Sequence, residues 1–207
     1  MPRPRQLTQL LAGLVAAGLG IALVVRSDLG LGPWDVLHQG VAERTGISMG
    51  MVLLGVGVVV LAAWVPLRQR LGLGTVLNVI VVGVTLDLCL RLLPELHGAT
   101  AQWTSLTSGV VAVGLGSGLY LGAGLGPGPR DGLMTGLAER GPSVRVVRTG
   151  IELSALALGW VLGGTVGIGT LVFALAIGPL VQFFLDRCAL APSPTIPEPL
   201  EGAAAAQ

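Results

Sequence analysis

Two short segments of the chain combine glycine, proline and aspartate in the same order. The first reads GLGPWD over residues 30–35, and the second reads GPGPRD over residues 126–131. A proline suits the first turn of a helix, where its missing N–H is not needed, and an aspartate there complements the positive helix end. Free N–H groups at such a helix start can bind an anion, whereas the carboxylates could bind a cation or carry protons. Each segment is therefore a candidate site for a small solute or ion.

The residues after each proline predict a short amphipathic helix, about 33–44 in the first segment and 129–140 in the second. At helical spacing, the polar residues two, six and ten positions after each proline share one face of that helix. The predicted substrate-binding residues are Gly32, Pro33, Asp35, Gln39, Gly128, Pro129, Arg130, Asp131 and Thr135. The short helices could be re-entrant, with their N-termini near the middle of a bilayer. They could instead lie flat on its two surfaces.

The two segments belong to an internal duplication. With an offset of 96 residues, ten of the sixteen positions in 29–44 are identical to those in 125–140. The match includes a proline, an aspartate, a glutamate and an arginine, which composition alone does not readily produce. The match continues upstream, where Gly18 corresponds to Gly114. Downstream the offset falls by one residue to 95, so that Gly83 corresponds to Gly178. We therefore expect two repeats, over 1–97 and 98–188.

Composition places the chain in a membrane. Hydrophobic residues make up 52% of it and charged residues 11%, and its mean hydropathy is +0.82, whereas a soluble domain carries roughly 25% charge. The chain has no lysine and a formal net charge of +1, which excludes lysine-dependent chemistry and a basic surface for nucleic acid. Neither a nucleophile–base pair nor a metal-ligand spacing occurs. We expect no enzyme activity, no metal and no cofactor.

Six apolar runs are long enough to cross the roughly 30 Å of hydrocarbon in a bilayer. They cover about 7–25, 49–65, 72–93, 104–122, 149–164 and 166–185. Each repeat would contain three, and an odd number inverts the second repeat in the membrane. The fold class expected is thus all-α and polytopic, with six transmembrane helices in two inverted three-helix repeats. Each repeat would carry its short helix after its first span.

The distribution of arginine predicts the orientation in the membrane, because cytoplasmic loops are enriched in basic residues. With both termini in the cytoplasm, the inner segments contain Arg3, Arg5, Arg68, Arg70, Arg130, Arg140, Arg145, Arg148 and Arg187. The outer segments contain only Arg26, Arg44 and Arg91. Residues 189–207 have no periodic apolar pattern and are expected to form a disordered cytoplasmic tail.

Other conspicuous residues are expected to have structural roles. The four tryptophans, Trp34, Trp64, Trp103 and Trp160, lie near the ends of predicted spans, where the membrane interface favours them. Local ion pairs at helical spacing are expected for Asp87 with Arg91 and for Arg148 with Glu152. Glycines at every fourth position, Gly114, Gly118 and Gly122, predict a close-packing helix face. Such faces could also support a homo-oligomer.

The sequence resembles the YczE-like family of bacterial integral membrane proteins, which neighbours the broader YitT/YyaS group. The resemblance rests on SDLGLGPWDVLHQGVAERTGISMG, GLGPGPRDGLMTGLAER and VGIGTLVFALAIGPLVQ, and extends from the first span to Gln182. It implies a multi-pass protein of the cytoplasmic membrane, and it carries over no catalytic residue.

The function best supported by the sequence is a small-solute transporter or permease whose site lies at the two Gly-Pro-x-Asp turns. Its partners would be the lipid bilayer and a small solute or ion, and not nucleic acid. The alternative is a non-catalytic membrane factor that assists assembly or regulation of a membrane complex. A transporter would contain a polar cavity between the two turns, whereas an assembly factor would have a filled bundle.

Overall fold

A computed structural model describes residues 2–190, and in that range the chain is helical without a strand. The helices are α1 (Pro4–Ser27), α2 (Pro33–Thr45), α3 (Met49–Leu67), α4 (Leu73–Leu92), α5 (Ala99–Gly122), α6 (Pro129–Ala138), α7 (Val144–Val161) and α8 (Ile168–Cys188). Both short helices, α2 and α6, begin at the expected proline. Most of the expected tail, from residue 191 onwards, lies outside the described residues.

Five of the described helices, α1, α3, α4, α5 and α8, are long and apolar enough to cross a membrane. The other long helix, α7, is not among them. The sequence predicted a span over 149–164, but the helix begins five residues earlier and therefore includes the charged residues Arg145 and Arg148 as well as Glu152. The all-helical, multi-span class is thus as expected, and α7 contains three charged residues, Arg145, Arg148 and Glu152.

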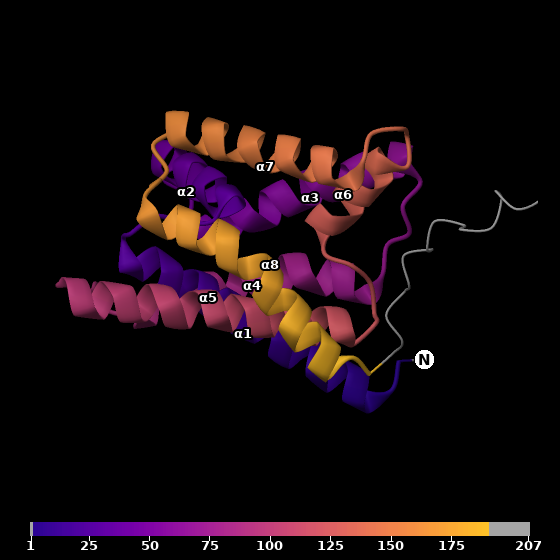
Figure 1. Ribbon diagram of the computed structural model, residues 1–207, viewed down its shortest axis with the longest axis horizontal. Coiled ribbons are helices and arrows are strands. Elements are labelled where there is room, and N and C mark those ends of the chain that lie inside the picture. Colours follow the sequence, from indigo (N-terminus) through magenta and orange to yellow (C-terminus); the bar gives the residue numbers. More distant parts are fainter. Residues whose placement is uncertain (1, 191–207) are drawn as a thin grey trace, which may run out of the picture.

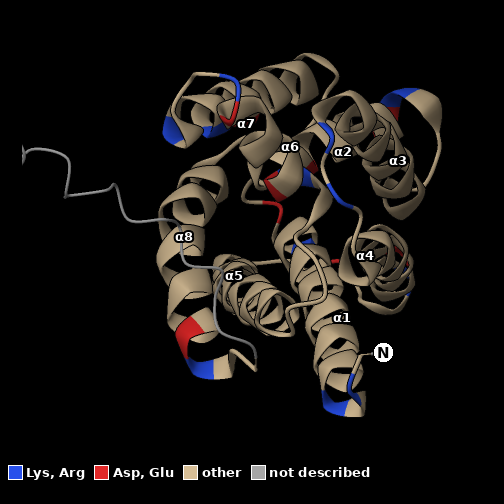
Figure 2. Ribbon diagram, turned by 90° about the vertical axis from the view of Figure 1, so that its right-hand side faces the viewer, with Lys and Arg blue, Asp and Glu red and all other residues tan. Residues whose placement is uncertain are grey.

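The helices form two layers (Figures 1 and 2). In one layer, α1 packs against α5, and this pair is flanked by α4 and α8. In the other layer, the short helices α2 and α6 lie between the long helices α3 and α7, each of which contacts both. The layers are joined directly where α3 packs against α4. The centre of the molecule is therefore surrounded by both short helices and by long helices from both layers.

Glycines bring α1 and α5 into close contact. A Cβ placed on Gly20 would lie 2.6 Å from the backbone nitrogen of Val113, and one on Gly116 would lie 2.5 Å from that of Ala17. Likewise, Gly13 faces the Gly116 carbonyl and Gly109 faces the Gly20 carbonyl. No larger side chain fits at this crossing, where small residues allow two backbones to touch.

The glycine face of α5 packs on α8, as the spacing predicted. A Cβ on Gly114 would lie 2.7 Å from that of Leu180, and one on Gly118 would lie 2.6 Å from that of Phe184. One turn further, Gly122 faces the carbonyl of Cys188. Because α8 covers this face within the same chain, the face is not free to bind a second copy.

The turns before the two short helices also make close glycine contacts. The turn before α2 packs on the start of α8, and the turn before α6 packs on the start of α4. Gly30 and Gly126 have φ angles of 109° and 127°, which favour glycine. At the first turn, the Gly169 N–H donates to the Leu29 carbonyl over 2.7 Å, and at the second the Gly74 N–H donates to the Leu125 carbonyl over 2.8 Å. Each short helix therefore starts from a fixed point in the interior.

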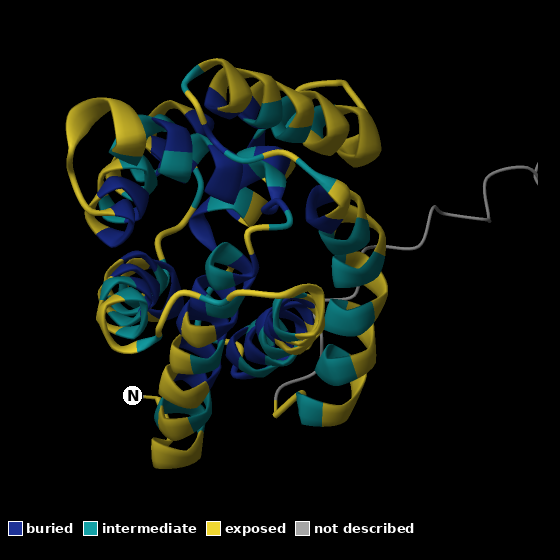
Figure 3. Ribbon diagram, turned by 90° about the vertical axis from the view of Figure 1, so that its left-hand side faces the viewer, coloured by how far each residue is buried: buried dark blue, intermediate teal, exposed yellow. Residues whose placement is uncertain are grey.

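The buried parts of the helices face the interior of the bundle and the exposed parts face outward (Figure 3). Many of the exposed residues have large apolar side chains. Val59 is 69% exposed, Leu92 72% and Leu175 78%. Large apolar side chains on the outer surface of several helices are expected where lipid rather than water surrounds the protein. The exposed surface therefore agrees with the apolar composition.

Candidate functional site

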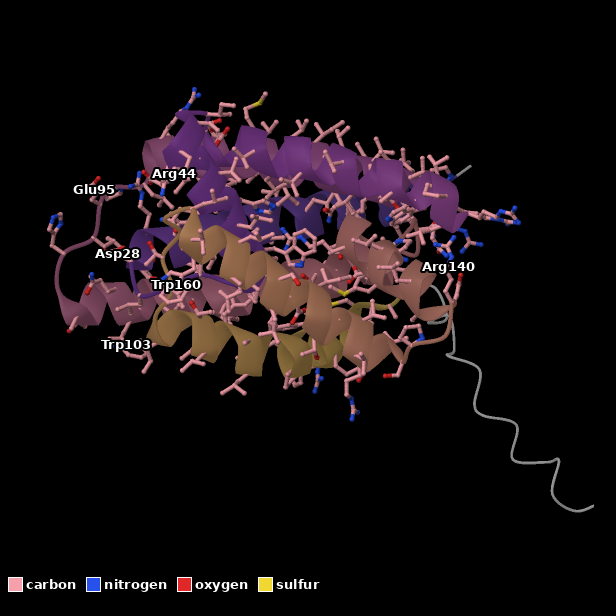
Figure 4. The ribbon with its side chains drawn as sticks, turned by 90° about the horizontal axis from the view of Figure 1, so that it is seen from above. Asp28, Arg44, Glu95, Trp103, Arg140 and Trp160 are labelled. Atoms are coloured by element: carbon pink, nitrogen blue, oxygen red, sulfur yellow. The ribbon has the colours of Figure 1, made fainter. Side chains whose placement is uncertain are left out.

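The N-termini of α2 and α6 meet in the interior of the bundle. A guanidinium nitrogen of Arg130, in the first turn of α6, lies 3.7 Å from Oδ1 of Asp35 in the first turn of α2. The guanidinium carbon of Arg130 also lies 4.9 Å from the centre of the Trp34 ring. In contrast, Arg44 at the end of α2 and Arg140 just beyond α6 lie at opposite ends of the molecule (Figure 4). The short helices thus point toward one another from opposite ends.

A cavity of about 400 Å³ lies where these helices meet. Seven of the nine predicted site residues line it: Gly32, Pro33, Asp35, Gly128, Pro129, Arg130 and Asp131. Long helices from both layers supply the rest of the wall, which includes Asn78 of α4 and Ser117 of α5. Its volume lies within the range of small-molecule pockets, roughly 300–1,000 Å³.

The other two predicted site residues, Gln39 and Thr135, are not part of the cavity wall. The side-chain oxygen of Gln39 accepts a 2.7 Å hydrogen bond from the Thr165 N–H, in the turn before α8. The Thr135 hydroxyl donates to the Asp131 carbonyl of its own helix over 3.1 Å. Both residues lie on the predicted polar faces, but each is one helical turn beyond its aspartate and therefore outside the cavity wall.

Asp35 is buried, with 3% of its surface exposed. Its Oδ1 lies 3.4 Å from Nδ1 of His38, which is one helical turn further along α2, and 3.7 Å from Arg130. None of these contacts has the geometry of a hydrogen bond, and Asp35 Oδ1, His38 Nδ1 and Trp34 Nε1 are buried without a hydrogen-bond partner. Buried polar atoms are nearly always paired. Three such atoms beside one cavity therefore indicate a place where a bound molecule could supply partners.

Asp131, the counterpart of Asp35 in the duplication, has a different environment. Its Oδ2 accepts a 3.2 Å hydrogen bond from the Tyr120 hydroxyl. The residue is exposed, and it lines the cavity. Within residues 2–190 it forms no ion pair. Of the two matched aspartates, Asp35 is therefore buried in the wall of the cavity, whereas Asp131 is exposed.

Two of the tryptophans assigned to the membrane interface are instead buried beside the site. Trp34 lines the cavity and is 9% exposed. Trp64, at 1% exposed, packs on Gly132 and donates a 3.0 Å hydrogen bond from Nε1 to the carbonyl of Pro129. Trp103 and Trp160 are exposed at the end of the molecule opposite Arg140 (Figure 4). Proximity to the end of an apolar run did not distinguish these two environments.

The lining of the cavity also includes charged residues that the sequence assigned to loops or local pairs. Arg148 and Glu152 of α7 form the expected ion pair, at 2.9 Å, and both line the cavity. Arg130 lies in the cavity as well, so neither it nor Arg148 is a loop residue. The lone tyrosine of the chain, Tyr120, was not predicted to be a site residue. A single tyrosine within an apolar run was the feature of the sequence that could have identified it as a site residue.

The cavity is closed on one side by the contact between α3 and α4. A Cβ on Gly83 would lie 2.7 Å from the carbonyl oxygen of Gly50. Asp87 accepts hydrogen bonds from the Ser48 hydroxyl, at 2.5 Å, and from the Gly50 N–H, at 2.7 Å. The expected pair between Asp87 and Arg91 is therefore wrong, because this carboxylate binds the N-terminus of α3, where free N–H groups favour an anion.

The corresponding region of the second half is open. Gly178, which matches Gly83 in the duplication, lines the cavity and has no neighbour within 4 Å of a Cβ placed on it. The adjoining lining residues, Arg148 and Glu152 of α7 and Gln182 of α8, lie in the halves of their helices nearer to Arg140. The side chain of Arg148 is 54% exposed. The cavity thus opens between α7 and α8, toward the end where the chain begins.

The cavity contains both hydrogen-bond donors and acceptors. No cluster of three or more potential His, Cys, Asp or Glu ligands occurs in the described residues. Two carboxylates and a guanidinium at meeting helix N-termini supply acceptors and donors for a charged solute. The surrounding valines and isoleucines supply an apolar wall.

Comparison with known proteins places the chain among proteins without an assigned function. A family model described as a family of unknown function (DUF6198) matches residues 4–186. An uncharacterized protein of Haemophilus influenzae is 42% identical over 88% of the chain and 84% of its own length. No solved structure matches.

Two relatives come from Bacillus subtilis. The uncharacterized membrane protein YczE is 34% identical over 85% of this chain and 83% of its own length. The uncharacterized protein YyaS is 29% identical over 84% of this chain and 89% of its own length. These relatives agree with the resemblance seen in the motifs. Together with the five apolar helices, they identify an integral membrane protein.

Proposed function

The chain belongs to the family of unknown function DUF6198, and we propose that it is a small-solute transporter of the bacterial cytoplasmic membrane. Its substrate site is the cavity between α2 and α6. The single observation that carries this proposal is that two short helices from opposite ends of the molecule meet at one cavity with their charged first turns. Interrupted backbone at mid-membrane depth is tolerated where it lines a cavity, as in many transporters.

The proposed architecture is a pair of inverted repeats, and matched contacts support it. At the crossing of α1 and α5, Gly13 faces Gly116 while Gly20 faces Gly109, so positions 96 residues apart exchange partners. The turn at Gly30 packs on Gly167 and that at Gly126 packs on Gly72. Exchange of this kind is what a two-fold axis in the membrane plane produces. In this arrangement α7 crosses the membrane with its polar residues turned toward the cavity.

The proposed orientation has both termini in the cytoplasm. With Arg130 and Arg148 assigned to the cavity, seven arginines remain at or beyond the helix ends on the side where the chain begins. They are Arg3, Arg5, Arg68, Arg70, Arg140, Arg145 and Arg187. Arg26, Arg44 and Arg91 remain on the other side, so the bias toward the cytoplasm is retained. The cavity then opens toward the cytoplasm in this structure.

A reporter fusion tests that orientation. The reporter is an enzyme that is active only outside the cytoplasm. Fused after Leu96, between α4 and α5, it should be active, because an odd number of spans precedes it. Fused after Gln69, between α3 and α4, it should be inactive, and inactivity at both positions would contradict the inverted arrangement.

Transport is tested by comparing solutes in cells and in proteoliposomes. Cells with and without the protein are first compared for the solutes that they retain, and solutes that differ are then assayed with purified protein in vesicles. We expect Asp35→Asn and Asp131→Asn each to reduce uptake at least tenfold without reducing membrane insertion, because a charge-assisted contact contributes about 1.5–3 kcal/mol. Asp28→Asn, at an exposed turn outside the cavity, is the matched control. Full uptake by both cavity variants would contradict the site.

The open cavity favours transport over a role in complex assembly, since an assembly factor needs only a filled bundle. We also propose that the protein is not an enzyme and needs no cofactor. A cavity with charged walls lets a polar solute cross an apolar layer, where an isolated charge is costly.

A further inference from the structure

We propose that the cavity binds an organic monocation, with its ammonium or guanidinium group on Asp131 and its apolar body against α4 and α8. This inference rests on the proposed function in one respect, which is that the bound molecule is taken to be the transported solute. Binding itself is a separate property of the cavity and can be measured without transport.

The first argument is the balance of charge inside the cavity. Its lining includes three carboxylates and two guanidinium groups, and these are Asp35, Asp131, Glu152, Arg130 and Arg148. Arg130 lies 3.7 Å from Asp35, and Arg148 lies 2.9 Å from Glu152. The remaining carboxylate, Asp131, has a hydrogen bond from the neutral Tyr120 hydroxyl and no ion pair in the described part of the chain. The cavity wall also contains the imidazole of His38, 3.4 Å from Asp35, and with this imidazole neutral a cation completes the balance.

The second argument is that the other half of the site already holds a cationic group. The guanidinium of Arg130 lies over the Trp34 ring and beside the buried Asp35 carboxylate. An aromatic face next to a carboxylate is the combination that proteins use to bind ammonium and guanidinium groups. At Asp131 the aromatic neighbour is Tyr120, and no side-chain cation lies within ion-pair distance there.

The unpartnered polar atoms show that the pocket lacks hydrogen-bond partners which a ligand could supply. Nε1 of Trp34 is a buried donor without an acceptor, and Oδ1 of Asp35 is a buried acceptor with only long contacts, at 3.4 Å from Nδ1 of His38 and 3.7 Å from Arg130. Both residues line the same cavity as Asp131. A cation with N–H groups and a nearby hydroxyl or carbonyl could satisfy both atoms, whereas a bare alkali ion offers no acceptor to Trp34.

The size and walls of the cavity favour an organic cation over an inorganic one. About 400 Å³ is far larger than one ion needs, since a water molecule accounts for about 30 Å³ of liquid. Apolar residues of α4 and α8, including Val79, Val82, Phe173 and Ile177, line the cavity. Such walls would gain from burying the hydrocarbon part of a solute.

Binding is tested with three probes of similar size on the purified full chain in detergent. The probes are protonated 2-amino-1-phenylethanol as the cation, 1-phenylethanol as the neutral compound and benzenesulfonate as the anion, and sodium chloride is titrated separately. We expect only protonated 2-amino-1-phenylethanol, which carries both an ammonium group and a hydroxyl, to bind saturably by calorimetry. Asp131→Asn should weaken it at least tenfold, which is the loss expected when a charge-assisted contact is removed.

Two further variants separate a direct charge effect from a loss of structure. Asp131→Glu keeps the charge and should retain affinity within a few-fold, and Asp28→Asn, outside the cavity, should leave it unchanged. Saturable binding of benzenesulfonate without binding of the cation would overturn the inference. Equal cation affinity in Asp131→Asn, or displacement of the cation by an equal concentration of sodium, would also overturn it.

Failure of this inference and failure of the transport proposal give different results. If protonated 2-amino-1-phenylethanol binds through Asp131 but no solute crosses vesicles containing the protein, the cation site holds and the transport proposal is wrong. If uptake of an anionic or neutral solute depends on Asp35 and Asp131, transport holds and the substrate class proposed here is wrong.

Discussion

At the scale of single residues, the site depends on a difference between two otherwise similar motifs. Between the proline and the aspartate, the first motif has Trp34 and the second has Arg130. If both positions had the same residue, either two indole rings or two like charges would face each other at the centre. The exchange of one residue allows the arginine of one half to lie over the tryptophan of the other, at 4.9 Å. The duplication supplies the geometry, and divergence at one position supplies the contact.

Trp64 supports this centre from α3, and its matched position gives a test. Replacing Trp64 with phenylalanine removes the donor to the Pro129 carbonyl and part of the packing on Gly132. The stability of the purified protein should fall by about 1–3 kcal/mol, because a buried acceptor loses its partner. Trp160, 96 residues later, is 68% exposed, so Trp160→Phe should change stability by less than about 0.5 kcal/mol.

Chemical denaturation in a single detergent, followed by circular dichroism, compares the two tryptophan variants directly. Equal loss of stability in Trp64→Phe and Trp160→Phe would contradict the support that Trp64 gives to the start of α6. Loss in neither would mean that the hydrogen bond to Pro129 contributes nothing measurable.

At the scale of elements, the sequence predicted most of the helices and the starting residues of the two short ones. Proline after glycine defines where α2 and α6 begin, and long apolar runs define the five most apolar helices. The beginning of α7 was missed because its first turn contains charged residues, which hydropathy reads as a loop. Similarly, hydropathy cannot say which side of a helix faces lipid, so Trp34 and Trp64 were placed at the surface.

Two matched glycines distinguish the closed pair of helices, α3 and α4, from the open pair, α7 and α8. At Gly83, a Cβ would collide with the Gly50 carbonyl oxygen at 2.7 Å, whereas at Gly178 no atom lies within 4 Å. Gly83→Ala should therefore destabilise the protein by about 1–3 kcal/mol through overpacking. Gly178→Ala should cost less than about 1 kcal/mol, because it meets no other helix and its helix preference is offset by the restriction that Pro179 places on the residue before it.

Thermal unfolding of the two alanine variants side by side measures this difference. The change and the position within each half are the same, and the local difference is that Gly178 precedes Pro179 whereas Gly83 precedes Val84. If Gly178→Ala costs as much as Gly83→Ala, then α7 and α8 are in close contact in the protein and the cavity is closed on both sides.

At the scale of the whole molecule, the two halves have similar sequences and different packing. The pair α3 and α4 is closed through Gly50, Gly83 and Asp87, and the pair α7 and α8 is open at Gly178. A transporter of two inverted repeats can reverse its access by exchanging the conformations of its halves. If the proposed function and orientation hold, the structure corresponds to the state in which Asp131 is accessible from the cytoplasmic side and not from the opposite side.

Access from one side only can be measured with matched cysteines. Val181 lines the cavity, and its counterpart Leu86, 95 residues earlier, is fully buried. With Cys89 and Cys188 replaced by serine, Val181→Cys should react with a membrane-impermeant thiosulfonate at least tenfold faster in inside-out than in right-side-out vesicles. Leu86→Cys should react slowly in both, because its position lies between packed helices. Equal reaction rates of Val181→Cys from both sides would indicate a continuous pore. Solutes could then cross the membrane without an exchange of conformations between the two halves.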